Sequence, residues 1–181
     1  MDYACIAASE LGNISDRRVY LSLTGVAKSV PKLLMKKAGL NSAFMMLQYT
    51  TAALASENKG LCFPASADSI PTSLGQEDHV SMGSISGRKA LQVLENVEKI
   101  LAIELICAAQ SFDYHKPLKS SPVLESVHAF IRTKISHAEK DRVFAKDIDK
   151  AIAIIESRSI LAVAAQQSDF KTDFNNLFEN L

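Results

Sequence analysis

The chain has 181 residues, 48% of them hydrophobic, and its 20 Lys and Arg residues balance its 20 Asp and Glu residues. This length and apolar content suit one folded domain with a sizeable core, and the zero net charge argues against the basic surface that nucleic acid requires. The amino-terminal residues lack a basic stretch followed by an apolar one, and no apolar run approaches the roughly 18 residues that span a bilayer. We therefore expect no nucleic-acid partner, no export signal and no membrane insertion.

Three cysteines, Cys5, Cys62 and Cys107, stand far apart in apolar surroundings. An odd number of widely spaced cysteines is typical of buried thiols in a reducing compartment rather than of a disulfide framework. We therefore expect a cytoplasmic protein.

The first forty residues predict a helix that ends near Asn13 and a turn at residues 15–18. A segment broken by Gly25 and Pro31 follows. We expect no regular element to cross those two breaks.

Residues 41–58 predict a helix, with Asn41 or Ser42 placed as its cap and Gly60 just past its end. The residues between are good helix formers and are apolar around most of the circumference. A helix that is apolar nearly all round is a buried one, so we expect this helix to lie inside the protein.

Residues 82–112 predict a much longer helix, about 45 Å at 1.5 Å per residue. Its apolar residues recur at the three-and-four spacing of one helix face: Ala90, Leu94, Val97, Leu101, Leu105, Ala108 and Phe112. This face widens in the second half beyond what a surface helix needs, so we expect that half to pack against other subunits. Glu104 lies within it and would be costly if buried alone, so we expect a basic partner or a helix end across an interface.

Pro117 and Pro122 bracket a break, after which residues 123–136 and 147–166 predict two further helices, with Asp147 near the start of the second. A short amphipathic tail is indicated by Phe170, Phe174, Leu177, Phe178 and Leu181. No alternating strand pattern and no internal repeat persists. The predicted fold is all-α, a bundle of long helices in which residues 1–115 form the core and residues 116–181 the carboxy-terminal helices.

Residues 61–81 join the first buried helix to the long one and exceed the usual connection of about 2 to 8 residues. Their mixture of apolar and small hydroxyl residues favours a packed loop over a disordered linker. Glu77 and Asp78 lie at its end beside His79, and a carboxylate near apolar walls has a raised pKa that suits acid–base chemistry. The alternative is that both acids only cap the following helix. The histidines include no pair at the spacing of two metal ligands on one helix face, so we predict no metal site.

Three strings carry a family resemblance: QYTTAALASENK at residues 48–59, FPASADSIPTS at 63–73 and QEDHVSM at 76–82. Together they resemble histidine ammonia-lyase, a member of the aromatic amino acid lyases. The similarity covers most of the first 115 residues and thins beyond them. The related phenylalanine and tyrosine lyases commonly carry an amide where Glu77 stands, so Glu77 and His79 favour the histidine branch. Aromatic aminomutases share the fold and stay possible relatives.

The resemblance implies a homotetramer of long helices whose active sites are each assembled from several subunits. Such enzymes convert L-histidine to trans-urocanate and ammonia, with a methylidene-imidazolone electrophile that forms from an internal Ala-Ser-Gly. Glu77 matches the family's catalytic glutamate, which contacts the substrate or assists proton transfer. The rest of that motif, which we expect to hold the loop around it, comprises Gln76, Asp78, His79 and Ser81.

No glycine in the chain follows Ala-Ser, and the nearest approach, Ser86-Gly87, follows Ile85. The chain therefore holds no precursor of that cofactor, and it opens directly on a helical pattern. We expect the carboxy-terminal portion of a lyase, inactive alone, whose partner is a separate amino-terminal lyase chain or further copies of itself. An expression fragment, one half of a split gene and a decayed reading frame are equally compatible with this. The alternative is a helical oligomerisation module without catalysis.

Overall fold

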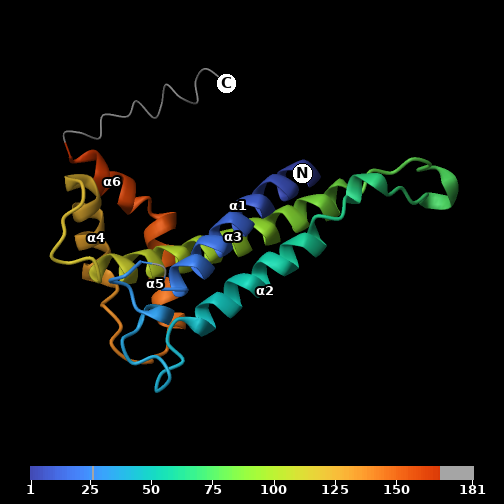
Figure 1. The fold of residues 1–181 in the computed structure, drawn as a ribbon. Helices are drawn as coiled ribbons and strands as arrows, with labels where there is room; N and C mark the ends of the chain where they lie inside the picture. The colour runs from blue at the N-terminus through green and yellow to red at the C-terminus, as the bar shows by residue number, and fades with distance from the viewer. Residues whose placement is uncertain (26, 168–181) are drawn as a thin grey trace.

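The computed structural model describes residues 1–25 and 27–167. Within them the chain forms six α-helices and no β-strand (Figure 1). The α-helices are α1 (Asp2–Leu23), α2 (Met45–Leu61), α3 (Gly83–Asp113), α4 (Pro122–Lys134), α5 (Ala145–Glu156) and α6 (Ser159–Ala165). Three short 3-10 helices are η1 (Lys32–Leu34), η2 (Ala65–Ala67) and η3 (Ser73–Gly75). The all-α prediction is confirmed, and the predicted tail from Phe170 to Leu181 lies outside the described residues.

Helices α1, α2 and α3 lie side by side as an elongated bundle, and α4, α5 and α6 gather around the carboxyl end of α3 (Figure 1). Helix α3 has 31 residues, so it extends for about 45 Å. The loop between α2 and α3 projects beyond the bundle at the opposite end. Nowhere in the described part of the chain is a helix both long enough and apolar enough to cross a membrane.

The larger part of the core forms where the second half of α3 meets α5 and the η1 segment. Ile103, Ile106 and Cys107 are buried there by their own chain, and they need no second subunit to cover them. A smaller cluster joins the first turns of α1 to α3, and includes Cys5 and Val93. The prediction of buried thiols is confirmed for two of the three cysteines, while the third is half-buried.

Helix α1 continues without interruption through residues 15–18, where the sequence predicts a turn. Ser15 and Asp16 face inward there: the Ser15 hydroxyl donates to Glu104, and Asp16 accepts from the Thr51 hydroxyl at 2.7 Å. Polar side chains of this kind favour turns when they bond to nearby backbone. The turn prediction was wrong because these two find partners on α3 and α2 instead.

Glu104 belongs to the same contact between α1 and α3. Besides the bond from Ser15, its carboxylate lies 3.4 Å from Arg18 Nη1. The predicted basic partner is therefore present, but it comes from the same chain and not from across an interface.

Helix α2 begins at Met45, so neither Asn41 nor Ser42 is its cap. The backbone N–H groups just before it donate instead to the Asp141 carboxylate, from Ser42 at 2.7 Å and from Ala43 at 2.8 Å. The helix start is thus held by a side chain almost a hundred residues away in the sequence.

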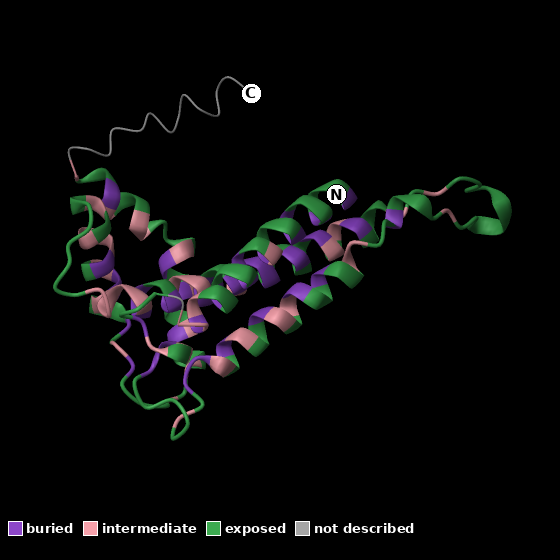
Figure 2. Cartoon of the chain, in the orientation of Figure 1, coloured by how far each residue is buried: buried purple, intermediate pink, exposed green. Residues whose placement is uncertain are grey.

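Only one face of α2 is buried, through Leu47, Thr51, Ala55 and Asn58. Apolar side chains elsewhere on the helix, such as Met46, are exposed, and Figure 2 shows exposed and buried residues alternating along α2. The prediction of a helix buried nearly all round was wrong for the single chain. The helix also continues through Gly60, which was expected to end it.

The predicted helix at residues 147–166 is divided in two. Helix α5 ends at Glu156, and Arg158 takes a left-handed conformation with φ of 53° before α6 begins. Asp147 lies in the first turn of α5, as expected, where it accepts a hydrogen bond from Arg142 Nε at 2.7 Å.

Candidate functional site

The predicted site lies in the loop between α2 and α3, which leaves the bundle as two arms (Figure 1). The outgoing arm, residues 62–71, contains η2, and the return arm, residues 78–82, leads into α3. At the tip the backbones of Thr72 and Glu77 pair, because the N–H of each donates to the carbonyl oxygen of the other, at 2.9 and 3.2 Å. This pairing places Glu77 at the end of the loop.

The tip itself turns through three consecutive residues with positive φ: Ser73 at 54°, Leu74 at 57° and Gly75 at 89°. Left-handed backbone is unfavourable for a residue with a side chain, by roughly 1 kcal/mol or more. Two of the three residues are therefore strained, and the contacts that close the loop must hold them there.

The loop is almost entirely exposed in the single chain, as the green segment of Figure 2 shows. The side chain of Phe63 is 77% exposed and that of Ile70 is 54% exposed, whereas Ala65 is buried against the bundle. The prediction of a loop packed against its own domain was wrong. No part of the described chain covers its apolar residues Phe63 and Ile70.

Glu77 is exposed like its neighbours, and among the described residues no hydrogen bond or ion pair engages its carboxylate. The alternative that Glu77 and Asp78 cap α3 is not supported, because that helix has Met82 as its N-cap, no side-chain cap bond and no acidic residue in its first turn. The Glu77 carboxylate therefore does not cap the start of α3.

The remaining predicted residues have different surroundings. His79 Nδ1 lies 2.7 Å from the Ser69 hydroxyl on the outgoing arm. The Ser81 hydroxyl accepts from the Gly83 N–H at 3.3 Å, just before α3. Gln76 and Asp78 are exposed. The catalytic role of Glu77 and the supporting roles of these four residues stay predictions.

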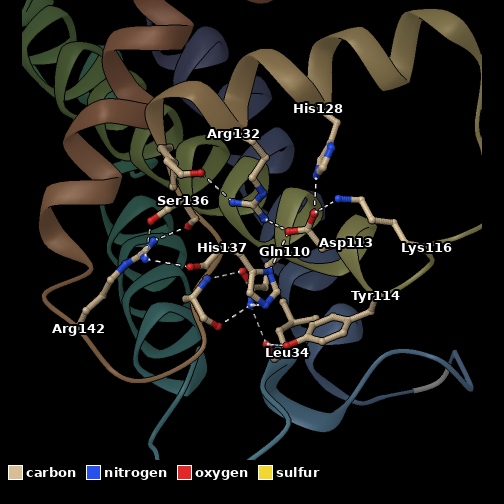
Figure 3. Close-up of polar contacts among 12 residues, drawn as sticks. Leu34, Gln110, Asp113, Tyr114, Lys116, His128, Arg132, Ser136, His137 and Arg142 are labelled. Carbon is tan, nitrogen blue, oxygen red and sulfur yellow. Dashed lines mark hydrogen bonds and ion pairs between the residues drawn. The ribbon is translucent and has the colours of Figure 1, made fainter.

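A second polar cluster, which the sequence analysis did not predict, surrounds Asp113 in the last turn of α3 (Figure 3). Four basic side chains lie within 3.1 Å of its carboxylate oxygens: Lys116, His128, Arg132 and His137. They come from the end of α3, from α4 and from the linker to α5, so Asp113 joins these three segments. The local signals are the four-residue spacing of His128 and Arg132, which places both on one helix face, and the three-residue spacing of Asp113 and Lys116.

Gln110 lies one turn earlier on α3 and is fully buried. Its Oε1 accepts from the Ala138 N–H at 3.1 Å, and its Nε2 donates to the Leu34 and Ala138 carbonyl oxygens at 3.2 and 2.9 Å. The same NH₂ group lies 3.3 Å from His137 Nε2. The other ring nitrogen of His137, Nδ1, lies 2.8 Å from the Asp113 carboxylate.

The pKa values of two groups in this cluster, Asp113 and His128, are shifted by their surroundings. Burial raises the pKa of Asp113, but the hydrogen bond from His137 and the charge of Arg132 outweigh it, so the net pKa is lowered. Burial also lowers the pKa of His128, and the attraction to Asp113 does not offset this. The cluster is therefore most favourable with Asp113 charged and His128 neutral.

The two polar centres lie at opposite ends of α3, about 45 Å apart along the helix. A cavity of about 650 Å³ adjoins the second one and is lined by Asp113, Tyr114 and His137, among others. Among the described residues no group of three His, Cys, Asp or Glu side chains is arranged to hold a metal ion. Asp113 is therefore engaged by four basic side chains, whereas the exposed Glu77 carboxylate has no hydrogen-bond or ion-pair partner among the described residues.

Residues 1–133 match the aromatic amino acid lyase family. The chain belongs to that family. It is 47% identical over 156 residues to histidine ammonia-lyase of Natranaerobius thermophilus, which covers 86% of this chain and 31% of the relative. Histidine ammonia-lyase of Vibrio cholerae is 46% identical over 155 residues, which are 86% of this chain and 30% of the relative.

Solved structures agree with this placement in the aromatic amino acid lyases. The crystal structure of histidine ammonia-lyase from Trypanosoma cruzi superimposes with a TM-score of 0.86 at 45% identity, over 91% of this chain and 32% of that one. Tyrosine aminomutase from Streptomyces globisporus gives the same TM-score of 0.86 at 33% identity, over 94% of this chain and 33% of that one.

The chain therefore spans about a third of the length of the curated relatives it matches. The predicted resemblance to part of a histidine ammonia-lyase is confirmed, and so is the expectation that aromatic aminomutases share the fold.

Proposed function

We propose that this chain supplies one portion of a histidine ammonia-lyase that converts L-histidine to trans-urocanate and ammonia. The observation that carries the proposal is the loop at residues 62–82, which projects beyond the bundle (Figure 1) and has the exposed Glu77 at its tip. Identities of 45 to 47% to histidine ammonia-lyases support the choice of substrate.

The Glu77 carboxylate becomes reactive when another protein surface covers the loop and excludes water from it. Removal of water disfavours the charged form of a carboxylate and raises its pKa, so the group becomes a better proton acceptor. It also becomes a stronger partner for the ammonium group of an amino acid. In the deamination a carbon–nitrogen bond breaks and a neighbouring carbon loses a proton, and a desolvated carboxylate can hold the leaving amine or accept a proton.

The electrophilic cofactor that the family resemblance implies does not fit this chain. No Ala-Ser-Gly occurs in the sequence, and the closest segment, Ile85-Ser86-Gly87, lies within α3. A residue buried in a regular helix is also not free to form a new backbone ring. The cofactor therefore has to come from outside these 181 residues, which alone are expected to be inactive.

The test combines this chain with an amino-terminal portion of a histidine ammonia-lyase relative that carries the Ala-Ser-Gly segment. We expect urocanate, followed by its ultraviolet absorbance, only from the mixture. Glu77→Gln should lower kcat by about 100-fold or more, the range typical for loss of a general acid–base group. Asp78→Asn, the same change at the next residue, is the control and should stay within a few fold. Full activity of the Glu77→Gln mixture, or no urocanate from any mixture, would contradict the proposal.

A specific observation favours a second candidate, a helical oligomerisation module. Large apolar side chains are exposed along the bundle on α1 and α3, with Tyr3 at 90%, Leu11 at 61% and Leu91 at 59% exposure. Contiguous exposed apolar surface marks association sites. We propose that these faces join copies of the chain, as in a homotetramer, whether or not the assembly is catalytic.

A further inference from the structure

We infer that Ser69 is a positioning residue: its hydroxyl joins the two arms of the loop and thereby fixes the place of Glu77. The inference rests on the proposed function, because it concerns how Glu77 is presented. A catalytic group has to be held to within about 0.5 Å of its working position, and Glu77 lies on an exposed loop with no packed core beneath its tip.

The Ser69 hydroxyl contacts two successive residues of the return arm. It accepts from the Val80 backbone N–H at 3.1 Å and lies 2.7 Å from His79 Nδ1. A hydroxyl offers one hydrogen and two lone pairs, so it can serve both partners in either tautomer of the imidazole. One side chain of the outgoing arm therefore holds the backbone and a side chain of the return arm.

This contact works together with the backbone pair at the tip. Two residues lie between Ser69 and Thr72, and two lie between Glu77 and Val80, so the two links close a small ring. Glu77 is a member of that ring. Its backbone can swing away only if one of the two links breaks.

The ring also holds a strained turn. Ser73 and Leu74 both have positive φ, a conformation that persists only where the surroundings determine it. In the single chain those surroundings are the backbone pair and the Ser69 contacts, because the side chains at the tip are exposed.

The base of the loop is fixed separately. Asp2, at the start of α1, accepts from the Ser66 N–H at 2.8 Å and from the Ser86 hydroxyl of α3 at 2.8 Å. The loop is therefore attached to both helices at its base, and Ser69 acts beyond that attachment. Loss of the Ser69 hydroxyl should free the tip without disturbing the bundle.

The first measurement is amide hydrogen exchange on the full chain. In Ser69→Ala the Val80 amide should exchange about 5- to 10-fold faster, as expected for loss of one hydrogen bond, while amides of α1 and α3 keep their rates. Ser69→Thr retains a hydroxyl and should restore protection. Ser73→Ala, the same chemical change at an exposed site of the same loop, is the control. An unchanged Val80 rate in Ser69→Ala would overturn the inference regardless of activity.

The second measurement uses the reconstituted lyase. We expect Ser69→Ala to lower kcat by about 10- to 100-fold with little change in KM, since misplacement by about 1 Å can have that effect, and Ser69→Thr to recover most of it. Normal kcat in Ser69→Ala, where Glu77→Gln is inactive, would overturn the positioning role alone. Full activity of Glu77→Gln would overturn the proposed role of Glu77 and the inference with it, so the two failures are distinguishable.

Discussion

Four basic side chains surround the Asp113 carboxylate. The pKa shifts of Asp113 and His128 make the stability of the fold depend on pH. Both Asp113 and His128 have lowered pKa values in the folded chain. The unfolded chain therefore binds more protons than the folded one wherever either group titrates. Each contribution to stability is present above the unfolded pKa and is lost as the pH falls, below about 6.5 for His128 and below about 3.9 for Asp113.

We predict that the free energy of unfolding declines between pH 7 and pH 5, in part through His128. One group contributes at most about 1.4 kcal/mol per pH unit. His128→Gln cannot take up the proton, so its urea midpoint should depend less on pH over this range. Ala129→Gln places the same residue on the exposed face of α4 and should leave the slope unchanged. Equal slopes for His128→Gln and the parent chain would contradict this account.

At the scale of elements, the contact between α1 and α3 depends on the absence of a side chain at Gly12. A Cβ there would lie 3.3 Å from both Ile100 Cδ1 and Val97 Cγ2, closer than packed carbons normally approach. The helices are therefore in close contact at this point, and an added Cβ requires the Ile100 and Val97 side chains to shift by a few tenths of an ångström.

We predict opposite effects for two glycine substitutions in these helices. Gly87→Ala in α3 adds a Cβ with no neighbour within 4 Å, so it should stabilise the chain by about 0.5 to 1 kcal/mol through helix propensity. Gly12→Ala gains the same propensity but overpacks the helix contact, at about 1 to 3 kcal/mol. Thermal unfolding should show a raised Tm for the first and a lowered Tm for the second. A Tm increase in Gly12→Ala would show that the contact is looser than described.

Helix boundaries that depend on local pattern could be predicted, and those that depend on distant partners could not. The apolar residues that recur at helical spacing predict both ends of α3 to within one residue. Pro117 and Pro122 predict where α4 begins. The start of α2 depends on Asp141, and the continuity of α1 on Glu104 and Thr51. No local spacing reveals such partners, because the fold itself brings them together.

In the whole molecule, the candidate site could also be predicted only where it depends on local sequence and not on distant partners. The irregular loop was expected from its length and residue types, and Glu77 from the resemblance of the QEDHVSM string. The exposure of the loop was not expected, because apolar residues such as Phe63 and Ile70 predict packing, yet no part of the described chain covers them. The cluster at Asp113 was missed because its residues come from three segments, the end of α3, α4 and the linker to α5, with little local signal.

We predict that the chain self-associates through its exposed apolar faces. Sedimentation should show a species larger than the monomer, and Leu11→Lys with Leu91→Lys should shift it toward monomer, because burial of a charge at an interface is unfavourable. Replacement of two exposed polar residues on α3, Gln92→Lys and Glu95→Lys, is the control for added charge and should have a smaller effect. A folded monomer at all concentrations would contradict the oligomerisation proposal.

The bonds from Asp141 to Ser42 and Ala43 bear on how this protein can evolve. The family match ends at residue 133, yet Ala138 bonds to Gln110 and Asp141 holds the entry to α2. A recombination event at the end of the match would separate a helix start from the residue that secures it. The segment after residue 133 is therefore part of the same folded unit as the bundle that it closes.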